Sequence, residues 1–356
     1  MQALTPPIEV IELQGGPFER GRIHGKRLAR SIRETVAIYQ GLFQRVGGPD
    51  REGVRTLATT YGEQIKAFNA DYFDEISGIA DGAELDVRDI LAINSRTEIL
   101  TTLLRTPAEC TSFCFTQECV LAQTWDWLRE LDGKPVLLRI RYDDDHTVLT
   151  MTEPGMVGKV GINSAGLGVA LNILVSPDAA QGCPVHVLLR AALDARSWDE
   201  AYERLTKFKI GTNSAITLAD DRGRCVTCEY RGGRVTPLHP KDGLIIHTNH
   251  YLSQTTPCPI LDSEPRYARA TDLISGLDQR TVEAAMQVLS DRSAGSHAIC
   301  VPWHDEDVFG DMGTVACVVS NLKSRTLYIA RGSPAGVTQL LPNTSQVDLR
   351  YDAFTL

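Results

Sequence analysis

The sequence predicts an α+β fold with two β-sheets, covered by helices and closed around one core. The residues before about 105 show helical periodicity, the residues after Cys110 form short alternating runs, and helical segments return twice among those runs. No repeat, low-complexity tract or long linker divides the chain, so we expect a single domain over residues 1–356. A helical N-terminal domain beside a β-rich one is the alternative.

The helical pattern begins at Pro17, a residue favoured in the first turn of a helix. Apolar residues then recur at helical spacing at Leu28, Ile32, Val36 and Tyr39. The further helices that we expect cover residues 56–68, 71–82, 87–104, 185–207, 266–274 and 282–289.

The strand pattern starts at Cys110, and residues 163–166 (Asn-Ser-Ala-Gly) are typical of a hairpin turn between two strands. The expected strands cover residues 110–115, 120–127, 136–142, 146–152, 159–162, 167–173, 214–219, 224–230, 244–249, 314–320 and 326–330.

Charge and composition exclude several classes of protein. The net charge of −9 over 356 residues argues against a binder of duplex nucleic acid. No run of eighteen apolar residues predicts a membrane span, and the N-terminus lacks the pattern of a secretory signal. The last residues, Phe354-Thr355-Leu356, are not a peroxisomal signal. We therefore expect a cytoplasmic protein without membrane or nucleic-acid partners.

Several motifs that superficially suggest a phosphate or metal site lack the spacing that such a site requires. Gly21 and Gly25 are separated by three residues, where a phosphate-binding loop needs four. Cys225 and Cys228 form a lone pair on an expected strand, without a second pair at zinc-ribbon spacing. His247 and His250 fall on opposite faces of a strand. We expect no metal site.

Cys110 lies where a helical segment passes into a strand. An arbitrary cysteine at such a boundary is usually a core residue. The stretches around it change that interpretation, since together they resemble one family in order and spacing. These stretches are residues 16–21 with His24-Gly25, 75–80, 91–98, Cys110-Thr111, 125–127, 158–166 and 247–250.

Across nearly the whole chain, the sequence resembles the isopenicillin-N acyltransferase (acyl-coenzyme A:6-aminopenicillanic acid acyltransferase) family of N-terminal-nucleophile hydrolases. The resemblance implies a four-layer αββα sandwich. It also implies that the Cys110 thiol attacks the Glu109 carbonyl and cuts the chain, leaving fragments 1–109 (alpha) and 110–356 (beta) associated. No bound cofactor is implied.

Such self-cleavage has a chemical logic. A thiol at its ordinary pKa is mostly protonated and needs a nearby base. Cleavage would give Cys110 a free α-amine, whose unperturbed pKa of about 7.7–8.0 suits proton transfer near neutral pH. One residue would then supply both the nucleophile and the base.

The resemblance also assigns roles to neighbouring residues. Asp126, between two tryptophans, matches the carboxylate that orients the amine, and Asn249 matches the oxyanion-hole side chain. Asn172 and Thr111 are further candidates for oxyanion or substrate binding. The alternatives are a strand-end cap for Asp126, a strand-ending Asn249 and a structural turn at Asn172.

Two positions depart from the family pattern. Glu109 stands where the family has Gly before the cysteine, and this charged, bulkier residue is expected to slow self-cleavage or to require a local rearrangement. Near Asp311 the penicillin enzyme has an arginine that holds the carboxylate of its β-lactam substrate. An anion there is expected to disfavour that carboxylate and to favour an amine-bearing acceptor.

The resulting hypothesis is an acyltransferase or amidase of secondary metabolism that does not act on penicillin itself. A small-molecule acyl donor, either an acyl-coenzyme A co-substrate or an amide, would acylate Cys110, and an amine or water would take the acyl group. One rival is an uncut Cys–His thiol hydrolase with His24, His247 or His297 as base. The other is a non-enzymatic binding protein with the same fold.

Overall fold

The computed structural model describes residues 8–103, 110–255, 258–332, 334 and 350–356. Its helices are α1 (Pro17–Arg27), α2 (Ala29–Arg45), α3 (Arg51–Phe68), α4 (Ala70–Ala83), α5 (Val87–Asn94), α6 (Arg96–Thr102), α7 (Val185–Leu193), α8 (Trp198–Lys207), α9 (Ser263–Ser275) and α10 (Val282–Leu289).

The strands fall into two sheets. The first holds β1 (Val10–Leu13), β4 (Val136–Arg141), β5 (Thr147–Thr152), β6 (Val160–Asn163), β7 (Leu167–Ile173), β8 (Ser214–Asp220), β9 (Cys225–Arg231) and β10 (Arg234–Leu238), in that spatial order. The second has the order β11 (Leu244–His247), β2 (Ser112–Phe115), β3 (Val120–Leu128), β13 (Asp311–Asn321), β14 (Thr326–Arg331) and β15 (Asp352–Thr355), with β12 (His304–Asp305) paired to β13.

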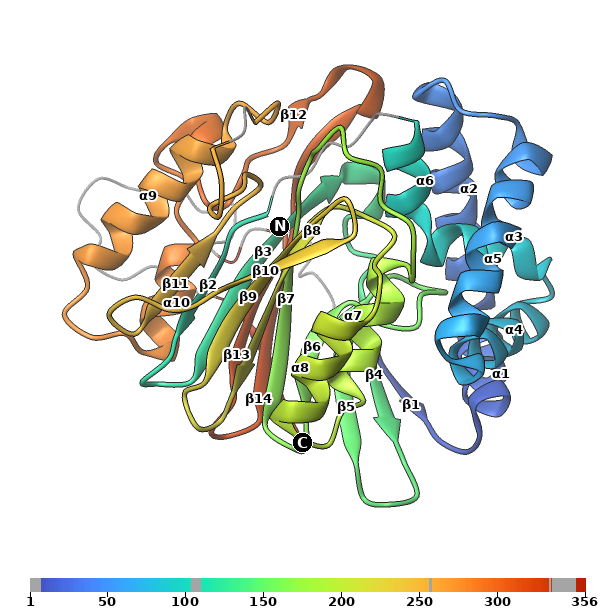
Figure 1. Cartoon of the computed structure of the whole chain (residues 1–356), viewed down its shortest axis with the longest axis horizontal. Coiled ribbons are helices and arrows are strands. Elements are labelled where there is room, and N and C mark those ends of the chain that lie inside the picture. Colours follow the sequence, from blue (N-terminus) through green and yellow to red (C-terminus); the bar gives the residue numbers. More distant parts are fainter. Residues whose placement is uncertain (1–7, 104–109, 256–257, 333, 335–349) are drawn as a thin grey trace, which may run out of the picture.

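The two sheets face each other, and helices cover their outer faces (Figure 1). Contacts of β7 with β2 and β3 join the sheets, while α7 packs on β6 and β7, and α8 on β8. On the far side, α9 and α10 bury Ile274, Val288 and Leu289 against Phe113 and other apolar residues of the second sheet. The predicted α+β fold, with two sheets inside and helices outside, is confirmed.

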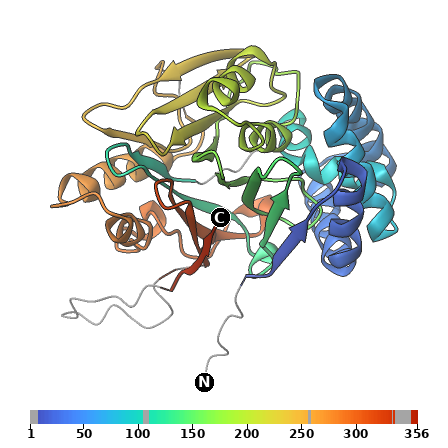
Figure 2. The same cartoon turned by 90° about the horizontal axis from the view of Figure 1, so that it is seen from below.

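One hydrophobic cluster runs from the N-terminal helices into both sheets. It joins Ile32 and Tyr39 of α2 to Leu137 and Met151 of the first sheet, and it continues to Val318 of the second. The helices α1 to α6 lie together at one side of the sandwich (Figure 2). They are therefore packed on the core that the sheets share.

The glycines that superficially suggest a phosphate loop serve helix packing instead. A Cβ on Gly21 would lie 1.9 Å from the Glu75 carbonyl oxygen, and one on Gly25 would lie 2.2 Å from that of Ile79. Side chains cannot be accommodated at such distances, so these glycines allow α1 and α4 to cross in backbone contact.

Three predicted helices are wrong in length because each is divided in the structure. The helix expected from Pro17 to Tyr39 breaks at Leu28, the one over residues 87–104 breaks at Ser95, and the one over 185–207 breaks between α7 and α8. The prediction missed the short strands β1, β10, β12 and β15. In the described residues, no helix has the length and apolar character needed to cross a membrane.

Candidate active site

Cys110 lies two residues before the start of β2, the first strand of the second sheet after the N-terminal helices. The Thr111 N–H donates to Thr124 Oγ1 (3.0 Å), and the Thr124 N–H donates to the Thr111 carbonyl (2.9 Å). These bonds extend the pairing of β2 with β3 by one residue. Cys110 is therefore fixed at a strand end and is only 7% exposed.

Side chains from three elements hold the backbone of Cys110 on both sides. Its N–H donates to Asn249 Oδ1 (2.9 Å). Its carbonyl oxygen accepts from Asn172 Nδ2 (2.9 Å) and from Arg266 Nη1 (3.1 Å). The Cys110 peptide therefore has partners from the loop after β11, from β7 and from α9, which brings together three residues far apart in sequence.

Arg266 also sets the orientation of Asn249. Its Nη2 donates to Asn249 Oδ1 (2.8 Å), and since a guanidinium has only donors, the amide oxygen must face it. The Asn249 Nδ2 then points away and donates to the Ile173 carbonyl (2.9 Å). Asn249 thus accepts from the Cys110 N–H. Its expected role as an oxyanion donor, through its second amide hydrogen, stays a prediction.

The structure places Asn172 and Thr111 at the same point. Asn172 Nδ2 also donates to the His247 carbonyl (3.3 Å), and its Oδ1 accepts from Ser112 Oγ (2.6 Å). Thr111 Oγ1 accepts from Arg266 Nη1 (3.1 Å). Both residues hold the strand end that carries Cys110, and Asn172 connects the two sheets there.

Asp126 is a buried carboxylate on β3, held by two threonine hydroxyls. Thr124 Oγ1 donates to Oδ2 (3.1 Å), and Thr314 Oγ1 donates to Oδ1 (2.5 Å). The register between β3 and β13 shifts just after Thr314, between Thr314 and Ala316. Such bulges often redirect a side chain beside an active site. The role of Asp126 in orienting an α-amine stays a prediction, because the Cys110 N–H is hydrogen-bonded here to Asn249.

The Cys110 thiol is protonated at neutral pH in this setting. Burial raises its pKa to about 12, and the negative charge of Asp126 contributes in the same direction. The Asp126 backbone N–H, Lys159 and Arg266 oppose this shift. A thiol with such a pKa is not a preformed thiolate, so any reaction at this sulfur would require a base that removes its proton.

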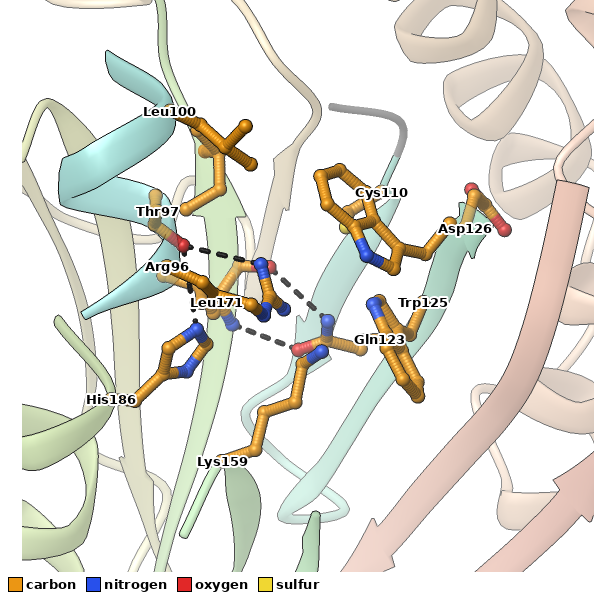
Figure 3. A pocket seen from close by; sticks show the side chains of 12 residues that line it. Arg96, Thr97, Leu100, Cys110, Gln123, Trp125, Asp126, Lys159, Leu171 and His186 are labelled. Carbon is orange, nitrogen blue, oxygen red and sulfur yellow. Dashed lines mark hydrogen bonds between the residues drawn. The ribbon is translucent and has the colours of Figure 1, made fainter. Parts of the chain in front are cut away.

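A small pocket lies beside Cys110 (Figure 3). Its walls are mostly apolar and aromatic, but Arg96, Lys159 and His186 also reach it. The remaining lining residues are Thr97, Leu100, Gln123, Trp125, Asp126, Trp127, Leu171 and Ile173. Gln123 is fixed by its bonds to the Leu171 backbone, donating to its carbonyl (3.1 Å) and accepting from its N–H (2.8 Å). An apolar cavity beside a buried thiol is suited to binding the hydrocarbon part of a small molecule.

The histidines proposed as alternative bases have other surroundings. His24 Nε2 accepts from the Gly155 N–H, and burial lowers the pKa of His24 to about 3. His247 Nε2 lies 2.9 Å from Glu229 Oε1, and His297 is exposed. Among the described residues, the histidine that lines the cavity is His186, which the sequence analysis did not select.

Two further residues that the sequence analysis selected are not among the described residues around Cys110. Asp311 begins β13 and forms a half-exposed ion pair with Arg129 (3.0 Å), outside the residues that line the cavity. Glu109, the expected residue before the cut, lies outside the described residues.

Sequence reasoning missed Arg266, Lys159, Arg96 and Thr314. Arg96 and Lys159 fall inside stretches that resemble the family, residues 91–98 and 158–166, so that resemblance could have indicated them. Arg266 and Thr314 carry no local signal, because their partners are 156 and 188 residues away along the chain.

The sequence is similar to known proteins. The sequence model of the acyl-coenzyme A:6-aminopenicillanic acid acyl-transferase family matches residues 114–336. The 40 kDa form of acyl-coenzyme A:6-aminopenicillanic-acid-acyltransferase from Emericella nidulans is 30% identical over 299 residues, which cover 82% of this chain and 84% of that protein.

Solved structures with lower similarity include penicillin V acylase from Agrobacterium tumefaciens, at 15% identity and a TM-score of 0.43, covering 63% of this chain and 82% of that one. The Caenorhabditis elegans ortholog of N-acylethanolamine-hydrolyzing acid amidase is 12% identical with a TM-score of 0.45, covering 61% and 93%.

The fold and the site thus define a two-sheet sandwich with a buried cysteine at the start of an inner strand. The chain belongs to the acyl-coenzyme A:6-aminopenicillanic acid acyl-transferase family.

Proposed function

We propose that this protein is a self-processing cysteine acyltransferase or amidase that carries acyl groups as a thioester on Cys110. The observation that supports this most directly is the fixation of the Cys110 backbone, whose N–H binds Asn249 and whose carbonyl binds Asn172 and Arg266. Every buried peptide needs hydrogen-bond partners, but those of Cys110 are side chains from three segments that lie far apart in the sequence. Here they hold the thiol beside the cavity.

In the proposed self-cleavage, the Cys110 sulfur attacks the Glu109 carbonyl carbon and the thiol gives up its proton. The C–N bond then breaks, the Cys110 nitrogen takes a proton, and Glu109 is left as a thioester. Water hydrolyses that thioester and releases the Glu109 carboxylate. Asn249 Oδ1 accepts from the Cys110 N–H in the uncut chain and would accept from the same nitrogen as a free amine.

In the proposed turnover, this amine removes the thiol proton while the sulfur attacks the acyl donor, an amide or an acyl-coenzyme A. The donor leaves with a proton, and an amine or water then takes the acyl group from the sulfur. Transfer and hydrolysis use the same groups and differ in whether water is excluded from the acceptor. We assign the reaction to secondary metabolism, with a substrate other than penicillin.

Intact-mass spectrometry tests the self-processing. The wild-type protein should give two masses, those of residues 1–109 and 110–356, whereas Cys110→Ala should remain whole and inactive. A Cys110→Ser variant serves as the matched control, because its hydroxyl keeps the size of the nucleophile and is expected to slow cleavage. A whole, fully active wild-type chain would contradict the proposal and favour the uncut Cys–His hydrolase.

For the acceptor, we propose that Asp311 disfavours carboxylate-bearing amines. The ion pair with Arg129 offsets much of its charge, so the expected effect is small, about threefold in kcat/KM between anionic and cationic amines. Asp311→Ala should remove this preference in a competition assay with the two amines. An unchanged preference would mean that Asp311 does not contact the acceptor.

A further inference from the structure

A buried pair of titratable side chains adjoins the segment that carries Asn249. Glu229 belongs to β9 of the first sheet, and His247 ends β11 of the second (Figure 1). Glu229 Oε1 lies 2.9 Å from His247 Nε2, and each of the two side chains is 1% exposed. The two strands lie in different sheets, so this contact joins the sheets next to the candidate site.

The hydrogen bonds of this pair require His247 as an imidazolium and Glu229 as a carboxylate. His247 Nδ1 lies 2.7 Å from the Thr248 carbonyl oxygen, so both ring nitrogens face an oxygen atom. A carbonyl oxygen has no proton to give, and Nδ1 must therefore donate. Burial raises the pKa of Glu229, but its hydrogen-bond donors, the His247 ring first among them, lower that pKa below its ordinary value. Because Glu229 is ionised, Nε2 must donate as well, and the pair is a buried ion pair.

Glu229 also holds the residues that follow β11. Its Oε1 accepts from the Leu252 N–H (2.6 Å), and its Oε2 accepts from the Ser253 N–H (3.1 Å). Residues 248–253, here called the Asn249 segment, are therefore bonded to β9 after Asn249, as the imidazolium is bonded to it before Asn249.

The position of this segment decides where the partners of Cys110 lie. Asn249 Oδ1 accepts from the Cys110 N–H. The His247 carbonyl accepts from Asn172 Nδ2 (3.3 Å), the same nitrogen that donates to the Cys110 carbonyl. A displacement of the segment would therefore move both amide side chains that hold the Cys110 peptide. A misplacement of about 1 Å can lower a reaction rate about 10²-fold.

We propose that His247 and Glu229 are positioning residues, whose ion pair fixes the segment that carries Asn249 for self-cleavage and acyl transfer. The inference rests on the proposed function and adds two residues to the same site. It also gives His247 a role other than that of a base. Both of its ring nitrogens are engaged, and within the described chain it is outside the residues that line the pocket beside Cys110.

A double-mutant cycle in the full chain tests the proposal. Glu229→Gln and His247→Gln should each slow self-cleavage, followed by intact mass, by about 10–100-fold. The kcat for acylation by p-nitrophenyl acetate, counted per cut chain and corrected with Cys110→Ala, should fall to a similar extent, with KM within about twofold. Because the two residues act as a unit, the double variant should be no slower than the slower single variant. Losses that multiply in the double variant would overturn the inference.

Hydrogen exchange measures the Asn249 segment without turnover. The comparison uses Cys110→Ala, which is expected to stay uncut, with and without Glu229→Gln. A glutamine offers one oxygen where the carboxylate offers two, so amides of residues 248–253 should exchange about tenfold faster or more. The fold should survive, because the Tyr251 hydroxyl still donates to the Tyr230 carbonyl of β9 (2.9 Å).

Thr227→Val is the matched control for a loss of stability in β9. Thr227 is buried two residues before Glu229, and its Oγ1 bonds to Thr217 Oγ1 of β8 (2.8 Å). The variant should melt at a lower temperature, because the Thr217 hydroxyl loses its partner. Its self-cleavage and the exchange of residues 248–253 should stay within about twofold of wild type. A loss as large as that of Glu229→Gln would overturn the inference, since any weakening of β9 would then slow the reaction.

The failure of this inference can be told apart from a failure of the proposed function. Unchanged exchange of residues 248–253 in Glu229→Gln overturns the inference even if Cys110 is the nucleophile. A loss in His247→Gln without a loss in Glu229→Gln also overturns it, because His247 would then act alone, as the base of an uncut hydrolase. Saturable ester turnover that survives Cys110→Ala contradicts the proposed function instead, and the exchange measurement still decides whether Glu229 orders the segment.

Discussion

Replacing Asp126 by Asn should lower kcat/KM for the acyl reaction by about 10²–10⁴-fold while the protein stays folded. The carboxylate is buried, and its charge adds to the effect of burial in raising the pKa of the Cys110 thiol. After self-cleavage the same charge would stabilise a protonated amine on Cys110, which the neutral amide cannot do. The hydroxyls of Thr124 and Thr314 can still bond to the amide, so the packing should survive.

Alkylation separates this electrostatic effect from a loss of folding. In the uncut chain, burial and the Asp126 charge both raise the pKa of the Cys110 thiol. Removing the charge should lower that pKa, and iodoacetamide should modify Cys110 of the uncut chain faster at a given pH. The variant would thus have a more reactive thiol and a slower enzyme. Thr314→Val, which removes one hydroxyl and keeps the carboxylate, is the matched control, with an expected loss of about tenfold. A kcat/KM within tenfold of wild type in Asp126→Asn would contradict the assigned role.

The elements that could be predicted from the sequence are those whose pattern is local. The strand over residues 167–173 and the helix over 282–289 were predicted with the bounds that the structure shows, because alternation and helical spacing are visible within each segment. The strands β1 and β15 have four residues each. They form by pairing with β4 and β14, so nothing in their own residues distinguishes them from loops.

The divided helices have a similar explanation. Leu28, which separates α1 from α2, is apolar and keeps the helical spacing, yet its φ of −112° and ψ of 20° end one helix and start the next. The packing of α1 on α4 sets the direction of α1. That contact involves glycines of the two helices that are more than fifty residues apart in sequence. A periodic pattern therefore predicts that helix exists there but not where the axis turns.

The residues of the candidate site also fall into those that could be predicted from the sequence and those that could not. The resemblance indicated Cys110, Asn172 and Asn249, and the structure brings these three together at one peptide. The residues that orient them could not be predicted, since Arg266 approaches from α9, and Thr314 reaches Asp126 through the pairing of β13 with β3. Positions of polar partners depend on how distant elements pack, and this information is absent from local spacing.

Arg266→Met is expected to abolish self-cleavage and to lower acyl turnover by about 10³-fold. Methionine keeps much of the length of the side chain but removes the donors to the Cys110 carbonyl, Thr111 Oγ1 and Asn249 Oδ1. Without the guanidinium, the Asn249 side-chain amide can rotate by 180° and point its nitrogen at the Cys110 N–H. Two donors would then face each other and the hydrogen bond would be lost. Intact mass and single-turnover acylation measure the two losses.

The variant should also be less stable, by about 3–5 kcal/mol, because Arg266 is buried and its removal leaves Asp262 without its partner. Asp262→Asn separates the two effects, since it weakens this ion pair (2.6 Å) and leaves the contacts of Arg266 with the site intact. Both variants should melt at lower temperature, but Asp262→Asn should still cut itself and turn over substrate below its melting point. If both variants lose activity in proportion to stability, the role of Arg266 is only to support the fold. If Arg266→Met loses activity while it is still folded, Arg266 positions the nucleophile. The bonds that distinguish the two variants are those to Cys110, Thr111 and Asn249.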